Sequence, residues 1–97
     1  MIKRIVMMQF KPSSLPLFFK LFEQSKYKIR NFPGCQHLEM WQDKANPERI
    51  FTYSFWDSEN DLNLYRSSPL FKSTWSKTKI LFDAPPQAWS VEVLSES

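Results

Sequence analysis

The stretch from Cys35 to Asp57 constrains the fold of this chain more than any other. It contains two runs of alternating residues, Gln36–Asp43 and Arg49–Trp56, joined by the polar segment Lys44–Glu48. Asn and Pro between two alternating runs are typical of a β-hairpin turn. A helix start follows directly after the second run. We therefore expect the rest of the chain to fold back onto a hairpin.

Large apolar side chains occupy both predicted faces of this hairpin. One face of the second strand is aromatic, with Phe51, Tyr53 and Phe55. We assign Trp41 and Trp56 to the opposite face of the hairpin. Because successive side chains of a strand point to opposite faces of a sheet, both faces of the hairpin require cover.

A strand and a helix are predicted before the hairpin. Residues Ile2–Phe10 are nearly continuously apolar, which is typical of a strand buried on both faces. Apolar residues then recur every three or four positions, which indicates an amphipathic helix. Ser14 is expected to cap its start, and Pro33 and Gly34 to end it. The apolar stripe consists of Leu15, Phe18, Phe22, Ser25, Ile29 and Phe32.

A second helix and a last strand are predicted after the hairpin. Ser58 and Asp61 resemble a capping box at the start of this helix. Pro69 cannot continue the backbone ladder, so the helix should break there and restart with Ser68 as a new cap. A final strand should run from Gln87 to about Leu94.

The predicted element order is strand, helix, strand, strand, helix, strand. This is the ferredoxin-like βαββαβ arrangement, an α+β fold with a four-stranded antiparallel sheet and two helices on one face. Residues 1–97 should form a single domain. The other sheet face would carry exposed apolar side chains, so we expect a homodimer in which a second copy covers that open face.

Composition narrows the classes of partner. The net charge is +3, but Lys and Arg are scattered along the chain and lie mostly on predicted helix surfaces, so no nucleic-acid partner is expected. One Cys and one His cannot build a zinc cluster, and no metal is expected. No apolar run approaches the roughly 18 residues of a membrane span, and the N-terminus lacks signal-peptide features. We expect a cytoplasmic protein with no membrane partner.

Three short motifs in a shared register resemble the antibiotic biosynthesis monooxygenase family of the dimeric α+β barrel superfamily. They are the corner Asn31-Phe32-Pro33-Gly34, the junction Phe55-Trp56-Asp57-Ser58 and the step Ser68-Pro69-Leu70-Phe71-Lys72. The resemblance covers nearly the whole chain in element order and spacing. It implies a homodimer with sheets packed face to face and a pocket between sheet and helices. Family members include cofactor-free oxygenases of aromatic polyketides and haem-degrading enzymes, so the fold does not determine the reaction.

The haem-degrading branch of that family can be compared with this chain residue by residue. By register from Trp56, the family's Trp position falls on Tyr65 and its haem-ligating His position on Trp75. The Asn position of its first strand falls near Met7 or Gln9. Because the ligand is missing, the resemblance argues against haem degradation, and we expect no cofactor.

The candidate site residues have both a functional and a structural interpretation. His37 is the candidate catalytic base because its pKa lies near neutrality, although a strand histidine can also simply face an interface or solvent. Tyr65, Phe71 and Trp75 share a helix stripe that flanks the Pro69 break. Such a stripe is either core or the wall of a ligand pocket that opens at the break.

Met7 and Gln9 complete the predicted ligand pocket, while Trp56 and Ser58 are expected to form a structural junction between strand and helix. Two functions stay open. One is a cofactor-independent monooxygenase whose small aromatic substrate reacts with O₂ through its own carbanion. The alternative is a non-catalytic dimeric module that binds a small hydrophobic or aromatic ligand.

Overall fold

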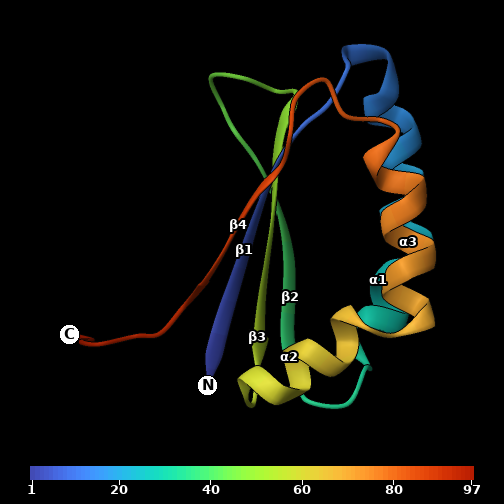
Figure 1. Cartoon of the computed structure of the whole chain (residues 1–97). Helices are drawn as coiled ribbons and strands as arrows, with labels where there is room; N and C mark the ends of the chain where they lie inside the picture. Colours follow the sequence, from blue (N-terminus) through green and yellow to red (C-terminus); the bar gives the residue numbers. More distant parts are fainter.

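The computed structural model describes residues 1–97 as one antiparallel sheet with helices on one of its faces (Figure 1). The strands are β1 (Ile2–Gln9), β2 (Cys35–Gln42), β3 (Arg49–Trp56) and β4 (Gln87–Val91), and the helices are α1 (Leu15–Arg30), α2 (Glu59–Arg66) and α3 (Pro69–Lys79). The four strands lie in the order β2-β3-β1-β4. This is the ferredoxin-like α+β fold, as predicted, with the second helix divided into α2 and α3.

The strand register determines which side chains face the helices. In the β1–β3 pair, Ile2 lies opposite Trp56 and Met8 lies opposite Ile50. Met8, Ile50 and Trp56 are buried beneath the helices. Because side chains alternate along a strand, even-numbered residues of β1 and β3 face the helices and odd-numbered residues form the open face.

Two buried apolar clusters attach the helices to the sheet. The larger one consists of Met8, Phe10, Phe18 and Ile50, and the smaller one of Cys35, Trp56 and Leu62. Phe10 stacks on Phe18 with ring centroids 4.4 Å apart, which joins the end of β1 to α1. Fully burying one such side chain stabilises a fold by about 1.5–3 kcal/mol. The clusters therefore set the distance between the helices and the sheet.

Serine side chains determine where α2 and α3 begin. The backbone N–H of Asp61 donates to Ser58 Oγ, and that of Phe71 donates to Ser68 Oγ, each at 3.1 Å. Both caps agree with the sequence prediction. Ser14 does not cap α1, because a 3-10 turn (Pro12–Ser14) precedes the helix. The backbone of Ser14 is already helical, whereas a capping residue needs an extended conformation.

The corner between α1 and β2 requires a glycine. Gly34 has a φ of 88°, a left-handed conformation that L side chains rarely adopt. A Cβ at this position would also lie 2.5 Å from the Cβ of Asp61 in α2. The corner that ends α1 therefore also determines how closely α2 approaches it.

Two details of the sheet differ from the sequence prediction. β4 ends at Val91 and not at Leu94, because Val91 pairs with Lys3 and β1 extends only one residue further, to Ile2. Trp41 pairs with Phe51 and lies on the aromatic open face, not on the opposite face. Paired residues of neighbouring strands share a face, and the hairpin register therefore places Trp41 there.

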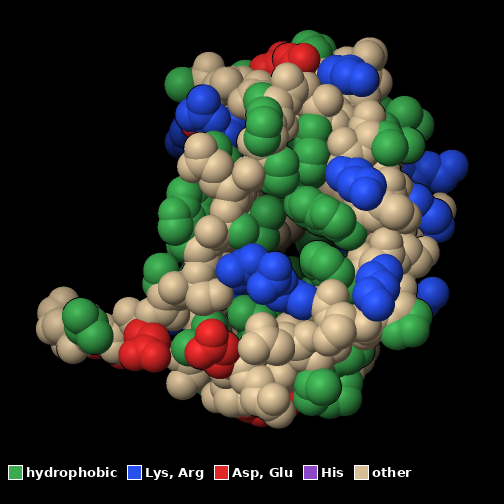
Figure 2. Space-filling view, viewed as in Figure 1, with side chains coloured by type: hydrophobic (Ala, Val, Ile, Leu, Met, Phe, Trp, Pro, Cys, Tyr) green, Lys and Arg blue, Asp and Glu red, His purple; other side chains and the backbone are tan.

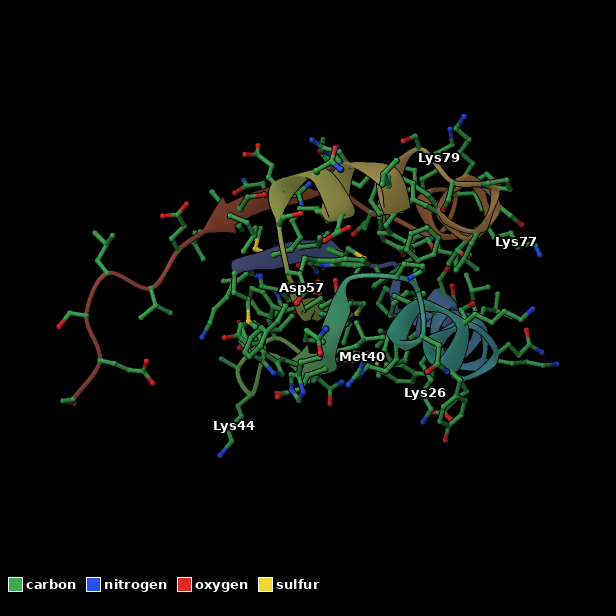
Figure 3. All side chains as sticks on the ribbon, turned by 90° about the horizontal axis from the view of Figure 1, so that it is seen from below. Lys26, Met40, Lys44, Asp57, Lys77 and Lys79 are labelled. Carbon is green, nitrogen blue, oxygen red and sulfur yellow. The ribbon has the colours of Figure 1, made fainter.

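Three lysines on α3 and the hairpin turn point away from the molecule. Figure 3 shows Lys77 and Lys79 on the outer side of α3 and Lys44 projecting from the β2–β3 turn. All three side chains are exposed. They are therefore solvated and take no part in holding the sheet and helices together. None of the helices combines the length and the apolar character needed to cross a membrane.

Replacing Ser68 tests the break between α2 and α3. Ser68→Ala removes the acceptor of the Phe71 N–H and should lower the free energy of unfolding by about 1 kcal/mol. Urea denaturation followed by circular dichroism measures this. Ser67→Ala is the matched control, since this exposed neighbour bonds only to the Asn63 carbonyl, and its effect should stay within about 0.5 kcal/mol. Equal losses in the two variants would contradict the capping role.

Candidate functional site

A cavity of about 300 Å³ lies between the inner face of the sheet and the three helices. Of its 20 lining residues, 12 are hydrophobic. The space-filling view shows a hollow at this place, with hydrophobic side chains inside and Lys or Arg side chains at its edge (Figure 2). An apolar cavity of this size with few polar groups is typical of a small-molecule site.

Aromatic rings form one continuous wall of the cavity. Trp56 stacks on Tyr65 with centroids 4.9 Å apart, and Tyr65 meets Phe71 edge-on at 5.3 Å. Phe71 in turn stacks on Trp75 at 5.9 Å. Tyr65 comes from the end of α2, whereas Phe71 and Trp75 come from α3. The break at Ser68 and Pro69 thus brings the predicted residues Tyr65, Phe71 and Trp75 together along the cavity.

Hydroxyl groups supply most of the polar character of the cavity. Ser54 Oγ already accepts a hydrogen bond from Trp56 Nε1 at 3.0 Å, and Thr78 Oγ1 donates to the Thr74 carbonyl at 2.8 Å. The phenol of Tyr65 has no hydrogen-bond partner within the chain. Burial, with a smaller contribution from Cys35, raises the pKa of Tyr65 well above its usual range. Tyr65 therefore stays a neutral hydrogen-bond donor at neutral pH.

Because the pKa of Tyr65 is raised in the folded protein, we expect the free energy of unfolding to depend on pH in alkaline solution. Above the ordinary tyrosine pKa of about 10, the unfolded state releases a proton that the folded state retains, so the free energy of unfolding falls as pH rises. This loss should be up to about 1.4 kcal/mol per pH unit steeper in the wild type than in Tyr65→Phe. Urea denaturation at several alkaline pH values measures the slopes. Tyr27→Phe, at a site that is 68% exposed, should match the wild type.

Met7 and Gln9 do not belong to the cavity wall. Both are odd-numbered residues of β1 and lie on the open face, while Val6 and Met8 between them face the cavity. The family resemblance does not align the first strand exactly, and the nearly continuous apolar run of β1 does not show which residues face the helices. The pairing of β1 with β3 shows that the even-numbered residues do.

His37 also lies on the open face and not in the cavity. It pairs with Phe55 across the sheet, and its Nε2 contacts the carboxylate of Glu39. Trp41 Nε1 donates to the same carboxylate at 2.7 Å, and the hydrogen bonds from Trp41 and His37 lower the pKa of Glu39. Because His37 is the only histidine, the cavity has no imidazole that could act as a base or ligate a haem iron. His37 therefore lies apart from the cavity, and its catalytic role stays a prediction.

Trp56 and Ser58 occupy the junction between β3 and α2. The Trp56 ring is 1% exposed and belongs to both the smaller buried cluster and the cavity wall. Ser58 caps α2 two residues later. Nowhere in the chain do three or more His, Cys, Asp or Glu side chains gather in a way that could hold a metal ion.

Two arginines of the cavity escaped the sequence analysis. Arg4 is an even-numbered residue of β1 and therefore faces the helices, and Arg66 is the last residue of α2. Both line the cavity. The sequence does contain a signal for Arg4. It is the only charged residue among the even-numbered residues of β1, which are otherwise apolar.

The fold and the cavity define this chain as a ferredoxin-like α+β domain with a ligand-sized space beneath its helices. The chain belongs to the antibiotic biosynthesis monooxygenase family, whose sequence profile matches residues 1–76 of its 97 residues. The match begins before β1 and ends within α3. It confirms the resemblance seen in the three motifs. No curated protein matches the chain significantly in sequence.

Solved structures share this fold over nearly their full length. A crystal structure described as an antibiotic biosynthesis monooxygenase has a TM-score of 0.91 and 16% identity, over 98% of this chain and 100% of that chain. A conserved protein from Methanosarcina mazei Go1 has a TM-score of 0.89 and 21% identity, over 93% and 89%. A protein from Mycobacterium tuberculosis has a TM-score of 0.89 and 16% identity, over 99% and 97%. At these identities the likeness establishes the fold alone.

Proposed function

We propose that this chain is a monooxygenase that holds a small aromatic substrate in the cavity and uses no metal or organic cofactor. The observation that carries the proposal is the aromatic wall of Trp56, Tyr65, Phe71 and Trp75 around a cavity of about 300 Å³. Its volume suits a ligand of about two fused rings. Family membership supports the reaction class.

The aromatic wall supplies binding and orientation. Offset stacking or edge-on contact with Phe71 and Trp75 favours a flat aromatic ligand over an aliphatic one of equal size. The neutral phenol of Tyr65 is free to donate a hydrogen bond to a substrate oxygen. Apolar walls keep water away from the reacting carbon, which protects a carbanion from protonation by solvent.

The substrate itself supplies the electrons in this reaction. Its carbanion adds to O₂ to give a peroxide anion, which takes up a proton to become a hydroperoxide. Loss of water from that hydroperoxide leaves a carbonyl group. In sum, a CH₂ group and O₂ become C=O and H₂O. Because the cavity contains no histidine or carboxylate, the substrate must lose its proton readily.

Oxygen consumption tests this function directly. With dihydroxynaphthalenes as the probes, the wild type should consume O₂ and give a product with one more oxygen and two fewer hydrogens, as measured by mass spectrometry. Trp75→Leu keeps an apolar side chain but removes the stacking ring, so kcat/KM should fall about tenfold. Tyr27→Leu, on the exposed side of α1, should leave kcat/KM unchanged.

The second candidate function is a non-catalytic module that binds the same kind of ligand. The lack of a carboxylate or imidazole among the cavity residues favours it. The same experiment separates the two functions. Saturable binding of the probes without O₂ consumption above the protein-free rate would support the binding module and contradict the oxygenase.

We also infer that two copies of the chain associate through the open sheet face. Aromatic rings gather there without cover from any helix: Trp41 stacks on Tyr53 at 4.6 Å, and Tyr53 meets Phe55 edge-on at 4.9 Å. Trp41 and Trp89 are 38% and 44% exposed. A contiguous apolar surface of this kind is typical of a protein–protein interface. A second copy offers the same aromatic surface in return.

A charge in the centre of the open face should separate the two copies. Light scattering after size exclusion should give twice the 11.6 kDa of one chain for the wild type and a single-chain mass for Tyr53→Glu. Association would remove two such carboxylates from water at a cost of several kcal/mol, which Lys3, whose Nζ lies 5.6 Å from the Tyr53 ring centroid, offsets only in part. Tyr27→Glu on α1 should keep the wild-type mass. A wild type that runs as a single chain at micromolar concentration overturns the homodimer.

A further inference from the structure

Arg4 occupies a position where an apolar residue would be expected. It lies on β1, a central strand, between the inward-facing residues Ile2 and Val6. Its partners across the sheet are Ser54 on β3 and Ser90 on β4, so a polar row crosses the inner face. A charge beneath helices costs free energy unless a partner compensates it. A row of this kind at the edge of an apolar cavity indicates a place for a polar part of a ligand.

No acidic side chain neutralises Arg4 or the neighbouring Arg66. The acidic partners of basic side chains lie elsewhere, in the ion pairs Lys26–Glu23 and Arg49–Asp43 and in the contact of His37 with Glu39. Arg4 Nη1 donates to Ser90 Oγ at 3.0 Å, which leaves its other N–H groups without a side-chain partner. Burial, and then the like charge of Arg66, lower the pKa of Arg4. Two guanidinium groups thus lie close together with their positive charges uncompensated.

Both arginines lie at one opening of the cavity. Pro86 and the first two residues of the edge strand β4, Gln87 and Ala88, also line the cavity, and β4 itself is exposed. The helices pack chiefly against β2 and β3, which leaves the β4 side of the cavity less covered. The rings of the aromatic wall come from the end of β3 and from α2 and α3, and they are buried or half-buried, whereas Arg66 is exposed. We therefore expect a ligand that enters beside β4 to meet the charges first and the rings further in.

We propose that Arg4 and Arg66 form an anion-binding subsite, and that the ligand is an aromatic monoanion. Its rings occupy the cavity, and its negative oxygen lies between the two guanidinium groups. The charge is that of a carboxylate or of an ionised phenol or enol. This inference rests on the proposed function and names the substrate class of that cavity.

Guanidinium groups suit this role because they are always charged and present several N–H donors in one plane. Charge-assisted hydrogen bonds to an oxyanion are roughly twice as strong as neutral ones. A bound anion also removes the repulsion between Arg4 and Arg66. For a phenol or enol substrate, the pair lowers the pKa of the acidic group, so that water can take up the proton and no imidazole or carboxylate is needed in the cavity.

A structural role for Arg4 makes the opposite prediction. If Arg4 only ties β4 to β1 through Ser90, then Arg4→Gln should lower the melting temperature of the free protein. If Arg4 belongs to an uncompensated charge pair, its removal relieves repulsion, and the melting temperature should stay equal or rise. Ser90→Ala removes the hydrogen bond from Arg4 but keeps the charges of Arg4 and Arg66. This variant should therefore still bind an anionic ligand more tightly than a neutral one.

Matched probes test the subsite by quenching of tryptophan fluorescence. Naphthoate and naphthamide have the same rings and size but differ in charge, and dinitronaphtholate carries its charge on a phenolic oxygen. We expect the wild type to bind naphthoate at least about tenfold more tightly than naphthamide, and this preference to weaken as salt is added. The comparison of naphthoate with dinitronaphtholate identifies which oxyanion the arginines prefer.

The variants assign that preference to the two arginines. Arg4→Gln and Arg66→Gln should each weaken naphthoate binding at least about tenfold and leave naphthamide binding within about twofold. Lys77→Gln is the control, since it removes the same charge from the outer side of α3 (Figure 3). Arg66 is exposed, so its variant keeps the test valid if Arg4→Gln is poorly folded.

The outcomes separate this inference from the proposed function. Equal affinity for naphthoate and naphthamide, or equal losses in Arg4→Gln and Lys77→Gln, overturns the anion subsite and leaves the aromatic cavity intact. If Trp75→Leu leaves the binding of naphthoate and naphthamide alike unchanged, the cavity is not the binding site, and both proposals fall. If the two arginine variants bind the anionic probes more weakly but bind naphthamide as the wild type does, both the anion subsite and the aromatic cavity are supported.

Discussion

Burial of the Trp56 ring is the interaction on which the rest of the site depends. The ring lies at the end of β3 and meets Phe32, at the corner after α1, with centroids 6.3 Å apart. The ring also stacks on Tyr65 of α2, and its Nε1 donates to Ser54 on its own strand. One side chain thus joins the sheet, the corner and the second helix, and it begins the aromatic wall of the cavity.

The sheet separates two kinds of aromatic surface. On the inner face, rings line a space that the helices enclose only in part, and this space suits a small ligand. On the open face, Trp41, Tyr53 and Phe55 form a broad layer suited to another protein surface. The alternation of a β-strand assigns each residue to one of these environments, so a shift of one position changes its role completely. Met7 and Gln9 illustrate this.

Much of the fold was predictable from the sequence because local signals agree with one another. The alternating hairpin, the Ser58 and Ser68 caps and the Pro33-Gly34 corner each carry their own physical reason, and all of them occur in the structure. Tyr65, Phe71 and Trp75 were predictable as a group because a helical stripe needs no information beyond spacing. Their placement along the cavity followed from the break between α2 and α3.

The rest of the site depends on long-range pairing, which a single sequence does not display. Apolar residues on both faces of β1 hide which residues face the helices. The register of the family resemblance points to Met7 and Gln9, whereas Val6 and Met8 line the cavity. His37 was chosen for its chemistry, but the β2–β3 register places it on the open face. In the sequence, Arg4 is one of many scattered charges. Only its place between Ser54 and Ser90 distinguishes it from them.

The edge position of β4 has a consequence for how such a protein diversifies. The family profile ends at residue 76, so the last 21 of the 97 residues, β4 among them, lie beyond it. Yet Gln87 and Ala88 line the cavity, and Ser90 holds Arg4. Substitutions in this exposed strand can alter the rim of the cavity without disturbing either buried cluster. Ligand preference can therefore drift during evolution at little cost to folding.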